Sequence, residues 1–167
     1  MVLSLSFHGA YRCRHSGACC TSNWPIPVEA DRLARLRAAI ATGALVSPRG
    51  IASAALFETM DPASSETPAV LGVEDHACVF FDAAHGRLCA VQRALGHDAL
   101  PLSCRQFPRV SLRDPRGVSV TVSHYCPTAA SLLGSPEPVT IVRNAPAFPA
   151  SAEYSGLDAT DALPPLL

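Results

Sequence analysis

The spacing of the cysteines constrains this chain more than any other feature of its sequence. Three of the seven cysteines fall within eight residues near the start, and two of these three are adjacent. The other four are spread widely along the chain. The full set is Cys13, Cys19, Cys20, Cys78, Cys89, Cys104 and Cys126. Adjacent cysteines are hard to explain as core filler, and thiolates are preferred ligands of soft metals. We therefore predict that these distant thiols converge on one metal centre.

Disulfide bonds explain this cysteine set less well than metal binding does. A chain of 167 residues can bury a sizeable core without cross-links, and an odd number of cysteines cannot all pair internally. The segment from Met1 to Phe7 lacks the basic start and long apolar run of an export signal. We therefore expect a cytoplasmic protein, in which thiols stay reduced.

The arginines support a metal–thiolate centre. All 13 basic residues are arginine, and the base composition of the genome is the simpler reason for the lack of lysine. Arg12 and Arg14 flank Cys13, however, and Arg105 follows Cys104. Four thiolates around a divalent metal leave a net negative charge, which nearby guanidinium groups can offset. We predict that Arg12, Arg14 and Arg105 surround the centre without binding the metal directly.

The hydrophobic pattern predicts short helices and one clear hairpin. An apolar stripe at Leu33, Leu36 and Ile40 predicts a helix over residues 28–42. Apolar residues that alternate with other residues on either side of a turn at 114–117 predict a β-hairpin over residues 110–123. We also expect helices at 51–60, 91–95 and 128–133, and a strand at 139–142.

The cysteines themselves are predicted to lie in turns and at helix starts. The stretch around Cys13 to Cys20 is expected to be irregular backbone because it contains Gly17 and several turn-forming residues. Residues 100–109 are expected to form a tight turn, and Cys78 and Cys89 to face each other across a hairpin. The fold predicted is a small, irregular α+β domain centred on metal.

The predicted domain limits are residues 1–143 for the metal-binding domain and 144–167 for a Pro- and Ala-rich tail. Within the domain, residues 44–72 read as a variable connection between two halves of one site. The tail ends in apolar residues, so we expect that it docks on a protein partner or belongs to a longer chain. The net charge of −1 and the absence of a long apolar run argue against nucleic-acid and membrane partners.

The sequence leaves open the role of the histidines and the identity of the metal. His15, His76 and His124 lie close to cysteines, and a polar role near the centre is expected for each. The cysteine spacing matches neither a zinc ribbon nor a ferredoxin. Seven thiols exceed what one zinc ion uses, so an iron–sulfur cluster is the first choice and zinc the second.

Four blocks of sequence resemble the bacterial cysteine-cluster family named for its CxxCxxCC signature (YkgJ-like). The likeness covers roughly residues 7–133, and the blocks are Tyr11-x-Cys13-x5-Cys19-Cys20-x3-Trp24-x-Ile26, Cys78-x-Phe80-Phe81-Asp82-x3-Gly86-x-Leu88-Cys89, Leu100-Pro101-x2-Cys104-Arg105-x-Phe107-Pro108-Arg109 and Cys126-Pro127. The family is regarded as a zinc- or iron-chelating domain. The third block is most similar to the branch that contains flagellin lysine-N-methylases.

The resemblance implies two functions of different kinds. The first is a metal-binding module that holds an iron–sulfur cluster, zinc or iron. The second is a lysine-N-methylase-like enzyme, or a redox subunit of one. Ser16 stands where the family has its second cysteine, and serine is a poor ligand for a soft metal, so the first loop supplies only part of the ligand set. A thiol-exchange protein is a third reading, which the lack of a C-x-x-C motif disfavours.

Overall fold

The computed structural model describes residues 1–60, 66–149, 154 and 156–158 of the chain. The chain divides into two compact units. Unit 1 consists of Met1–Ser16 and Gln106–Leu167, and unit 2 consists of Gly17–Arg105. Residues 106–149 therefore group with the N-terminal segment. The predicted limits of 1–143 and 144–167 stay a prediction, and parts of the predicted connection and tail lie outside the described residues.

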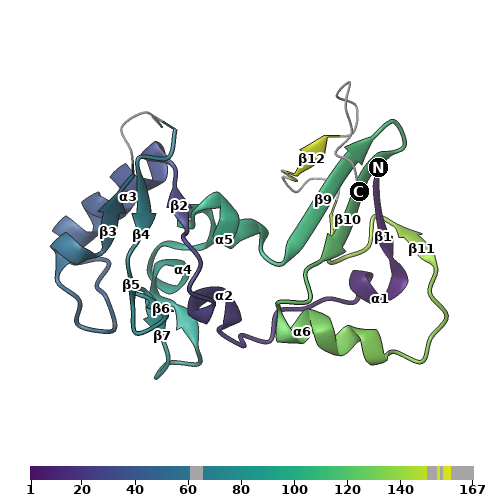
Figure 1. Ribbon diagram of the computed structural model, residues 1–167, viewed down its shortest axis with the longest axis horizontal. Helices are drawn as coiled ribbons and strands as arrows, with labels where there is room; N and C mark the ends of the chain where they lie inside the picture. Colours follow the sequence, from purple (N-terminus) through teal and green to yellow (C-terminus); the bar gives the residue numbers. More distant parts are fainter. Residues whose placement is uncertain (61–65, 150–153, 155, 159–167) are drawn as a thin grey trace. The chain divides into compact units, whose positions relative to one another are not determined.

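Unit 1 is built on a mixed β-sheet with the strand order β11-β1-β10-β9-β12 (Figure 1). The strands are β1 (Val2–Leu5), β9 (Arg109–Asp114), β10 (Gly117–Val122), β11 (Ile141–Arg143) and β12 (Leu157–Asp158). β9 and β10 form an antiparallel hairpin in which Gly117 pairs with Asp114. β1 lies parallel to β10 and antiparallel to β11. The N-terminal strand thus occupies an interior position of a sheet whose other strands come from the far end of the chain.

One face of this sheet is buried by short helices and by a loop after β11. The helices are α1 (Ser6–Gly9), α6 (Pro127–Ala130) and the 3-10 turn η3 (Ser131–Gly134). Alternate residues of β1 and β10 are buried, among them Val2, Val120 and Val122 in this core. The core consists of Val2, Val120, Val122, Cys126, Ala129, Ala145 and Phe148. Ala145 and Phe148 belong to the predicted tail, so its first residues are part of unit 1.

Unit 2 consists of short strands packed against one longer helix. Its helices are α2 (Ala18–Thr21), α3 (Ala30–Ala41), η1 (Ser53–Ala55), α4 (Ala90–Leu95), η2 (His97–Ala99) and α5 (Leu102–Gln106). Its strands are β2 (Pro27–Val28), β3 (Phe57–Thr59), β4 (Ala69–Leu71), β5 (Val73–Glu74), β6 (Ala77–Cys78), β7 (Phe81–Asp82) and β8 (Leu88–Cys89). These strands form a sheet in the order β2-β4-β3 and two small hairpins, β5–β6 and β7–β8.

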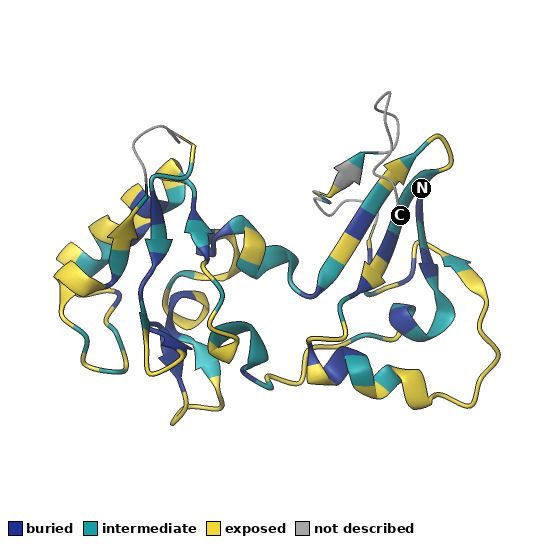
Figure 2. Ribbon diagram, viewed as in Figure 1, coloured by how far each residue is buried: buried dark blue, intermediate teal, exposed yellow. Residues whose placement is uncertain are grey.

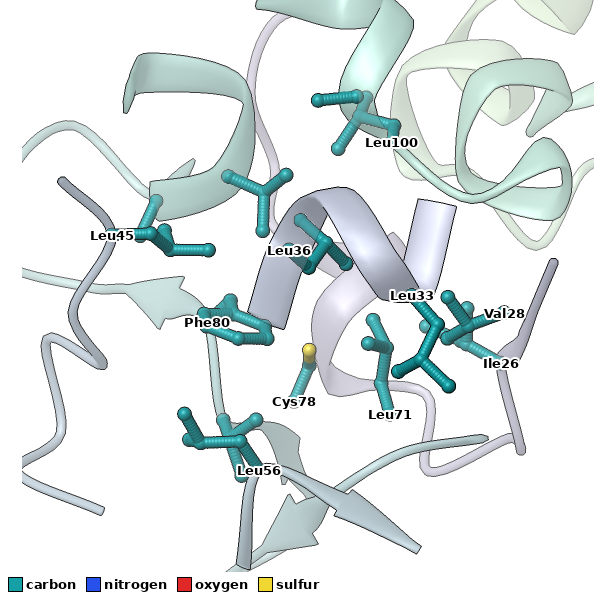
Figure 3. Packing of buried hydrophobic residues seen from close by; sticks show 14 of the residues in the cluster. Ile26, Val28, Leu33, Leu36, Leu45, Leu56, Leu71, Cys78, Phe80 and Leu100 are labelled. Atoms are coloured by element: carbon teal, nitrogen blue, oxygen red, sulfur yellow. The ribbon is translucent and has the colours of Figure 1, made fainter. Parts of the chain in front are cut away.

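The core of unit 2 lies beneath α3. Leu33 and Leu36 of α3 are 5 % and 0 % exposed and project toward the surrounding strands and loops (Figure 3). The outer surface of α3 is largely exposed, whereas β4 and the β6–β7 region are buried (Figure 2). Phe80 is fully buried in the same core, next to Cys78, whose sulfur points toward α3 (Figure 3). Hydrophobic burial of this kind supplies most of the stability of a small unit.

The predicted α+β class with short helices and β-hairpins is confirmed. The helix predicted at 28–42 is α3, and the predicted hairpin at 110–123 is formed by β9 and β10. The expected helix at 51–60 is only partly correct, because residues 53–55 form the 3-10 turn η1 but residues 57–59 form β3, which pairs with β4. The expected tight turn at 100–109 is also wrong, since α5 forms there.

Within the described part of the chain, every helix is too short or too polar to cross a lipid bilayer.

We expect Leu36→Ala to lower the free energy of unfolding of unit 2 by about 2–5 kcal/mol, because it leaves a cavity in the core beneath α3. Trp24 is the one tryptophan of the chain and lies in unit 2, so its fluorescence during urea unfolding reports this loss. Ala38→Gln on the exposed side of α3 is the control and should stay within about 0.5 kcal/mol. A loss equal to that of the control would contradict the placement of Leu36.

Candidate metal centre

The two units divide the predicted ligands between them. All seven cysteines are free thiols. Unit 1 holds two of them and unit 2 holds five. The five in unit 2, which we call the five-thiol cluster, are Cys19, Cys20, Cys78, Cys89 and Cys104. Four of these five pack against the hydrophobic core beneath α3: Cys20, Cys78, Cys89 and Cys104.

Two small hairpins position the first pair of thiols. Cys78 is the last residue of β6, where it pairs with Val73 of β5, and it is only 4 % exposed. Cys89 ends β8 and pairs with Phe81 of β7. The predicted hairpin around residue 86 therefore exists, but its register places Cys89 opposite Phe81 and not opposite Cys78. Cys89 also precedes α4, with the amides of Val91 and Gln92 near its sulfur.

A glycine allows the cysteine pair of α2 to approach the second hairpin. Gly17 precedes α2 with a backbone φ of 79°, a left-handed conformation that favours glycine. A Cβ atom at this position would lie 2.9 Å from the ring of Phe81. The expectation of irregular backbone here is therefore wrong for residues 18–21, which form α2 and carry Cys19 and Cys20.

The remaining thiol of the cluster comes from α5. Cys104 lies in the middle of this helix, and the first amide of the helix, that of Leu102, donates to both carboxylate oxygens of Glu29 at 3.1 and 3.3 Å. Glu29 precedes α3, so one carboxylate links the start of α3 to the start of α5. This contact fixes the helix that carries Cys104 against the helix that covers the core.

The sulfurs of the five-thiol cluster interact with one another. The Sγ atoms of Cys19 and Cys20 are 3.8 Å apart, and the thiol of Cys20 also hydrogen-bonds to Cys89. Donation from Cys20 lowers the pKa of Cys19 and of Cys89, and it raises the pKa of Cys20 itself. Cys20 therefore keeps its proton, while a negative charge on either neighbour is stabilised.

The two deeper thiols are held in the neutral form. Burial raises the pKa of Cys78 to about 12, and the nearby Cys89 and Cys19 add to this effect. Burial also raises the pKa of Cys104 strongly, with further contributions from Cys89 and Cys78. Thiolates this close together cannot all carry charge in a low-dielectric site unless a cation joins them.

The thiols as they stand are not arranged as a finished coordination sphere. Among the residues that the structure describes, no three His, Cys, Asp or Glu side chains are already set to hold a metal ion. The chemistry of the donors nevertheless fits a soft metal, because all five are sulfur atoms. The distance between Cys19 and Cys20 also fits, since a tetrahedral ion with metal–sulfur bonds of about 2.3 Å has edges of about 3.8 Å.

Cys13 and Cys126 belong to unit 1. Cys126 is 4 % exposed in the core of that unit and precedes α6, as predicted. Its Sγ lies 3.8 Å from the hydroxyl of Tyr11, which is also hydrogen-bonded to Cys13. Burial and these two thiols raise the pKa of Tyr11 above its usual range. Cys13 is exposed, with the Nδ1 atom of His15 4.0 Å from its sulfur.

The three arginines predicted to surround the centre are also divided between the two units. Arg12 and Arg14 are exposed in unit 1, beside Cys13. Arg105 is half-buried at the end of unit 2 and lies next to Cys104 in α5. Arg49 also acts on the five-thiol cluster, because its charge lowers the pKa of Cys78 against the larger effect of burial. Sequence reasoning missed Arg49 because it lies in the segment read as a variable connection.

A buried carboxylate stabilises the hairpin that carries Cys89. Asp82 of β7 has a side chain that is 3 % exposed and accepts from Nη1 of Arg93 at 2.6 Å and from Nδ1 of His85 at 2.9 Å. Burial opposes the charge on Asp82, but the hydrogen bonds from His85 and Arg93 outweigh burial and lower its pKa to about 2. The turn between β7 and β8 is therefore fixed by charge as well as by backbone pairing.

We expect Asp82→Asn to destabilise unit 2 at neutral pH, and we expect this effect to disappear in acid. A carboxyl with a folded pKa near 2 and an ordinary value of 3.8 stabilises the fold above pH 3.8. This stabilisation is lost as the pH falls toward 2. Unfolding free energies of both proteins between pH 7 and pH 2, followed by Trp24 fluorescence, should converge at the acid end. A difference that stays constant over that range would contradict the assignment.

Comparisons with known proteins give no match to this chain. No family model, curated protein or solved structure matches it. The likeness to the YkgJ-like family therefore stays a prediction that depends on the four sequence blocks. The chemistry of the five-thiol cluster provides the basis for a functional assignment.

Proposed function

We propose that unit 2 is a metal-binding module and that the five-thiol cluster supplies the ligands. The observation that supports this most directly is the grouping of five cysteines from α2, β6, β8 and α5 in one small unit, where the thiols of Cys19, Cys20 and Cys89 interact directly. These residues are separated by up to 85 positions in the sequence, from Cys19 to Cys104. An inert set of core thiols has no need of such mutual contact, whereas a shared metal requires it.

Metal binding would convert an unfavourable arrangement into a stable one. As neutral thiols, Cys78 and Cys104 are held far from ionisation by burial and by their neighbours. A divalent cation replaces the thiol protons and offsets the charge of the resulting thiolates, so binding releases protons and depends on pH. Because the thiols come from short elements, the same bonds would tie those elements together.

The short hairpins of unit 2 give metal binding a structural consequence. β5, β6, β7 and β8 are each two residues long. Isolated two-stranded hairpins are marginally stable at best in water. Those that carry Cys78 and Cys89 depend on the core beneath α3, and a metal that joins both cysteines would stabilise them further.

Two kinds of centre are compatible with the cluster. The number of thiols favours an iron–sulfur cluster, because five cysteines exceed the four that a single zinc ion uses. The separation of 3.8 Å between Cys19 and Cys20 favours a metal ion that takes two cysteines. Zinc does so, and so does each iron of a [2Fe–2S] cluster bound by four cysteines, whereas a [4Fe–4S] cluster takes one cysteine per iron.

The proposal for unit 2 does not require the thiols of unit 1. Cys126 packs in the apolar core of unit 1, where a small hydrophobic residue serves equally well. Cys13 is exposed. A ligand role for both, as for Arg12 and Arg14 beside them, stays a prediction from the sequence. Cys13 therefore offers a control for variants of the cluster.

The lysine-N-methylase-like activity, or a redox subunit of such an enzyme, is the alternative that the family resemblance implies. A metal centre in unit 2 is compatible with either role. We further propose a cytoplasmic setting, since free thiols such as those of the five-thiol cluster persist where the environment is reducing.

We expect protein purified without oxygen to contain stoichiometric metal, and we expect Cys20→Ser to lose that metal together with stability. Cys20 contacts both Cys19 and Cys89, so its replacement removes the central thiol of the cluster. Elemental analysis gives the metal content, and the visible spectrum distinguishes the two kinds of centre. Broad absorption near ~400 nm with acid-labile sulfide indicates an iron–sulfur cluster, and a colourless zinc protein indicates a single ion.

The matched control is Cys13→Ser, which changes an exposed thiol of unit 1 and should leave the metal content unchanged. Metal-free protein that stays folded with all seven thiols reactive would refute the proposal. Equal metal loss in both variants would show that the ligands are not confined to unit 2.

A further inference from the structure

We propose that Arg49 is the cation that offsets the charge of the metal–thiolate centre in unit 2 and hydrogen-bonds to a metal-bound thiolate there. The inference rests on the proposed function, because it assigns a residue to the same centre. Arg49 lies in the segment 44–72, which the sequence pattern presents as a variable connection. The contacts of this segment instead direct one arginine toward the hairpin that carries Cys78.

The backbone around Arg49 is fixed to the chain next to Cys78. The hydroxyl of Ser47 donates to the carbonyl of Val79 at 2.6 Å, and Val79 directly follows Cys78. The amide of Arg49 in turn donates to the Ser47 hydroxyl at 3.3 Å. Leu45, just before this turn, is 1 % exposed in the core beneath α3. The turn is therefore anchored at two points.

The side chain of Arg49 lies over the β5–β6 hairpin. Its Nη2 atom is 3.7 Å from a carboxylate oxygen of Glu74 and 3.5 Å from one of Asp75. Glu74 pairs with Ala77, the residue before Cys78. The arginine side chain is 21 % exposed, whereas the two acids are 52 % and 88 % exposed. The acids thus contact the guanidinium from the solvent side, and its inner side remains for another partner.

The inner side of the guanidinium has a donor without an acceptor. The Nε atom of Arg49 is buried and has no hydrogen-bond partner among the residues that the structure describes. Buried donors of this kind are uncommon in folded proteins and call for an acceptor. A thiolate of the occupied centre would supply both the acceptor and the negative charge.

The charge of the centre explains why such a cation is needed. Four thiolates and one divalent ion carry a net charge of −2, which a low-dielectric site destabilises. Charged hydrogen bonds to coordinating sulfur reduce that cost. Glu74 and Asp75 work in the opposite direction, because they share the positive charge of Arg49. Removing them should therefore leave metal binding as tight as before or tighter.

The test is zinc affinity, measured on metal-free protein by competition with a chromophoric chelator. We expect Arg49→Gln to weaken zinc binding by about ten- to a hundredfold, the range of one charge-assisted hydrogen bond. Arg49→Lys keeps the charge and should recover most of that loss. The double variant Glu74→Gln/Asp75→Asn should bind zinc at least as tightly as the unchanged protein. Arg143→Gln, which changes an exposed arginine of unit 1, is the control and should have no effect.

Several outcomes would overturn the inference. Unchanged affinity in Arg49→Gln would show that the arginine does not act on the centre. Weaker binding in the double variant would show that the ion pairs with Glu74 and Asp75 are what the centre needs. If Arg49→Gln does not fold, zinc affinity is compared in Arg49→Lys and in the double variant. Weaker binding in the double variant would then show that the centre needs the ion pairs and not the charge of Arg49 alone. A wild-type protein that binds no zinc and no iron would instead refute the proposed function, and this inference with it.

Discussion

Each sulfur in the five-thiol cluster raises or lowers the cost of ionising its neighbours, and this coupling governs what unit 2 can do. The thiol of Cys20 favours charge on Cys19 and Cys89, while burial and these same neighbours oppose charge on Cys78. Such a group is stable when it is largely protonated or when a cation replaces the protons. The helices α2 and α5 and the hairpins β5–β6 and β7–β8 supply the thiols of this one arrangement. A metal-bound state therefore changes the charge, the pH dependence and the stability of the unit together.

Local sequence signals predicted the elements that depend on local interactions. The stripe of Leu33 and Leu36 predicts α3, and the turn at 114–117 predicts the β9–β10 hairpin. The failures involve distant partners. β1 pairs in parallel with β10, more than a hundred residues away in the sequence, so nothing local marks residues 2–5 as an interior strand. β3 forms because β4 pairs with it, so the helical turn of the alanine-rich segment before it, η1, ends before residue 57.

The candidate site was predictable in its residue types and less so in its grouping. Seven cysteines identify sulfur chemistry, but spacing cannot show that Cys13 and Cys126 belong to one compact unit and the other five to another. That division depends on the pairing of β1 with the C-terminal strands, which is a long-range property. Arg49 was missed for a related reason. Its contact with the Cys78 hairpin depends on a hydrogen bond from Ser47 to Val79, which joins segments 32 positions apart.

In the proposed metal centre, a bound metal protects the thiols of unit 2 as a group. Alkylation of the metal-loaded protein, followed by peptide mass spectrometry before and after chelation, measures this protection for each cysteine. We predict that chelation exposes at least four of Cys19, Cys20, Cys78, Cys89 and Cys104 together, whereas Cys13 is modified equally in both states. Metal protection of Cys13 to the same extent as the five thiols of unit 2 would contradict a shared centre in unit 2. Modification of all five thiols in the metal-loaded protein would contradict it as well.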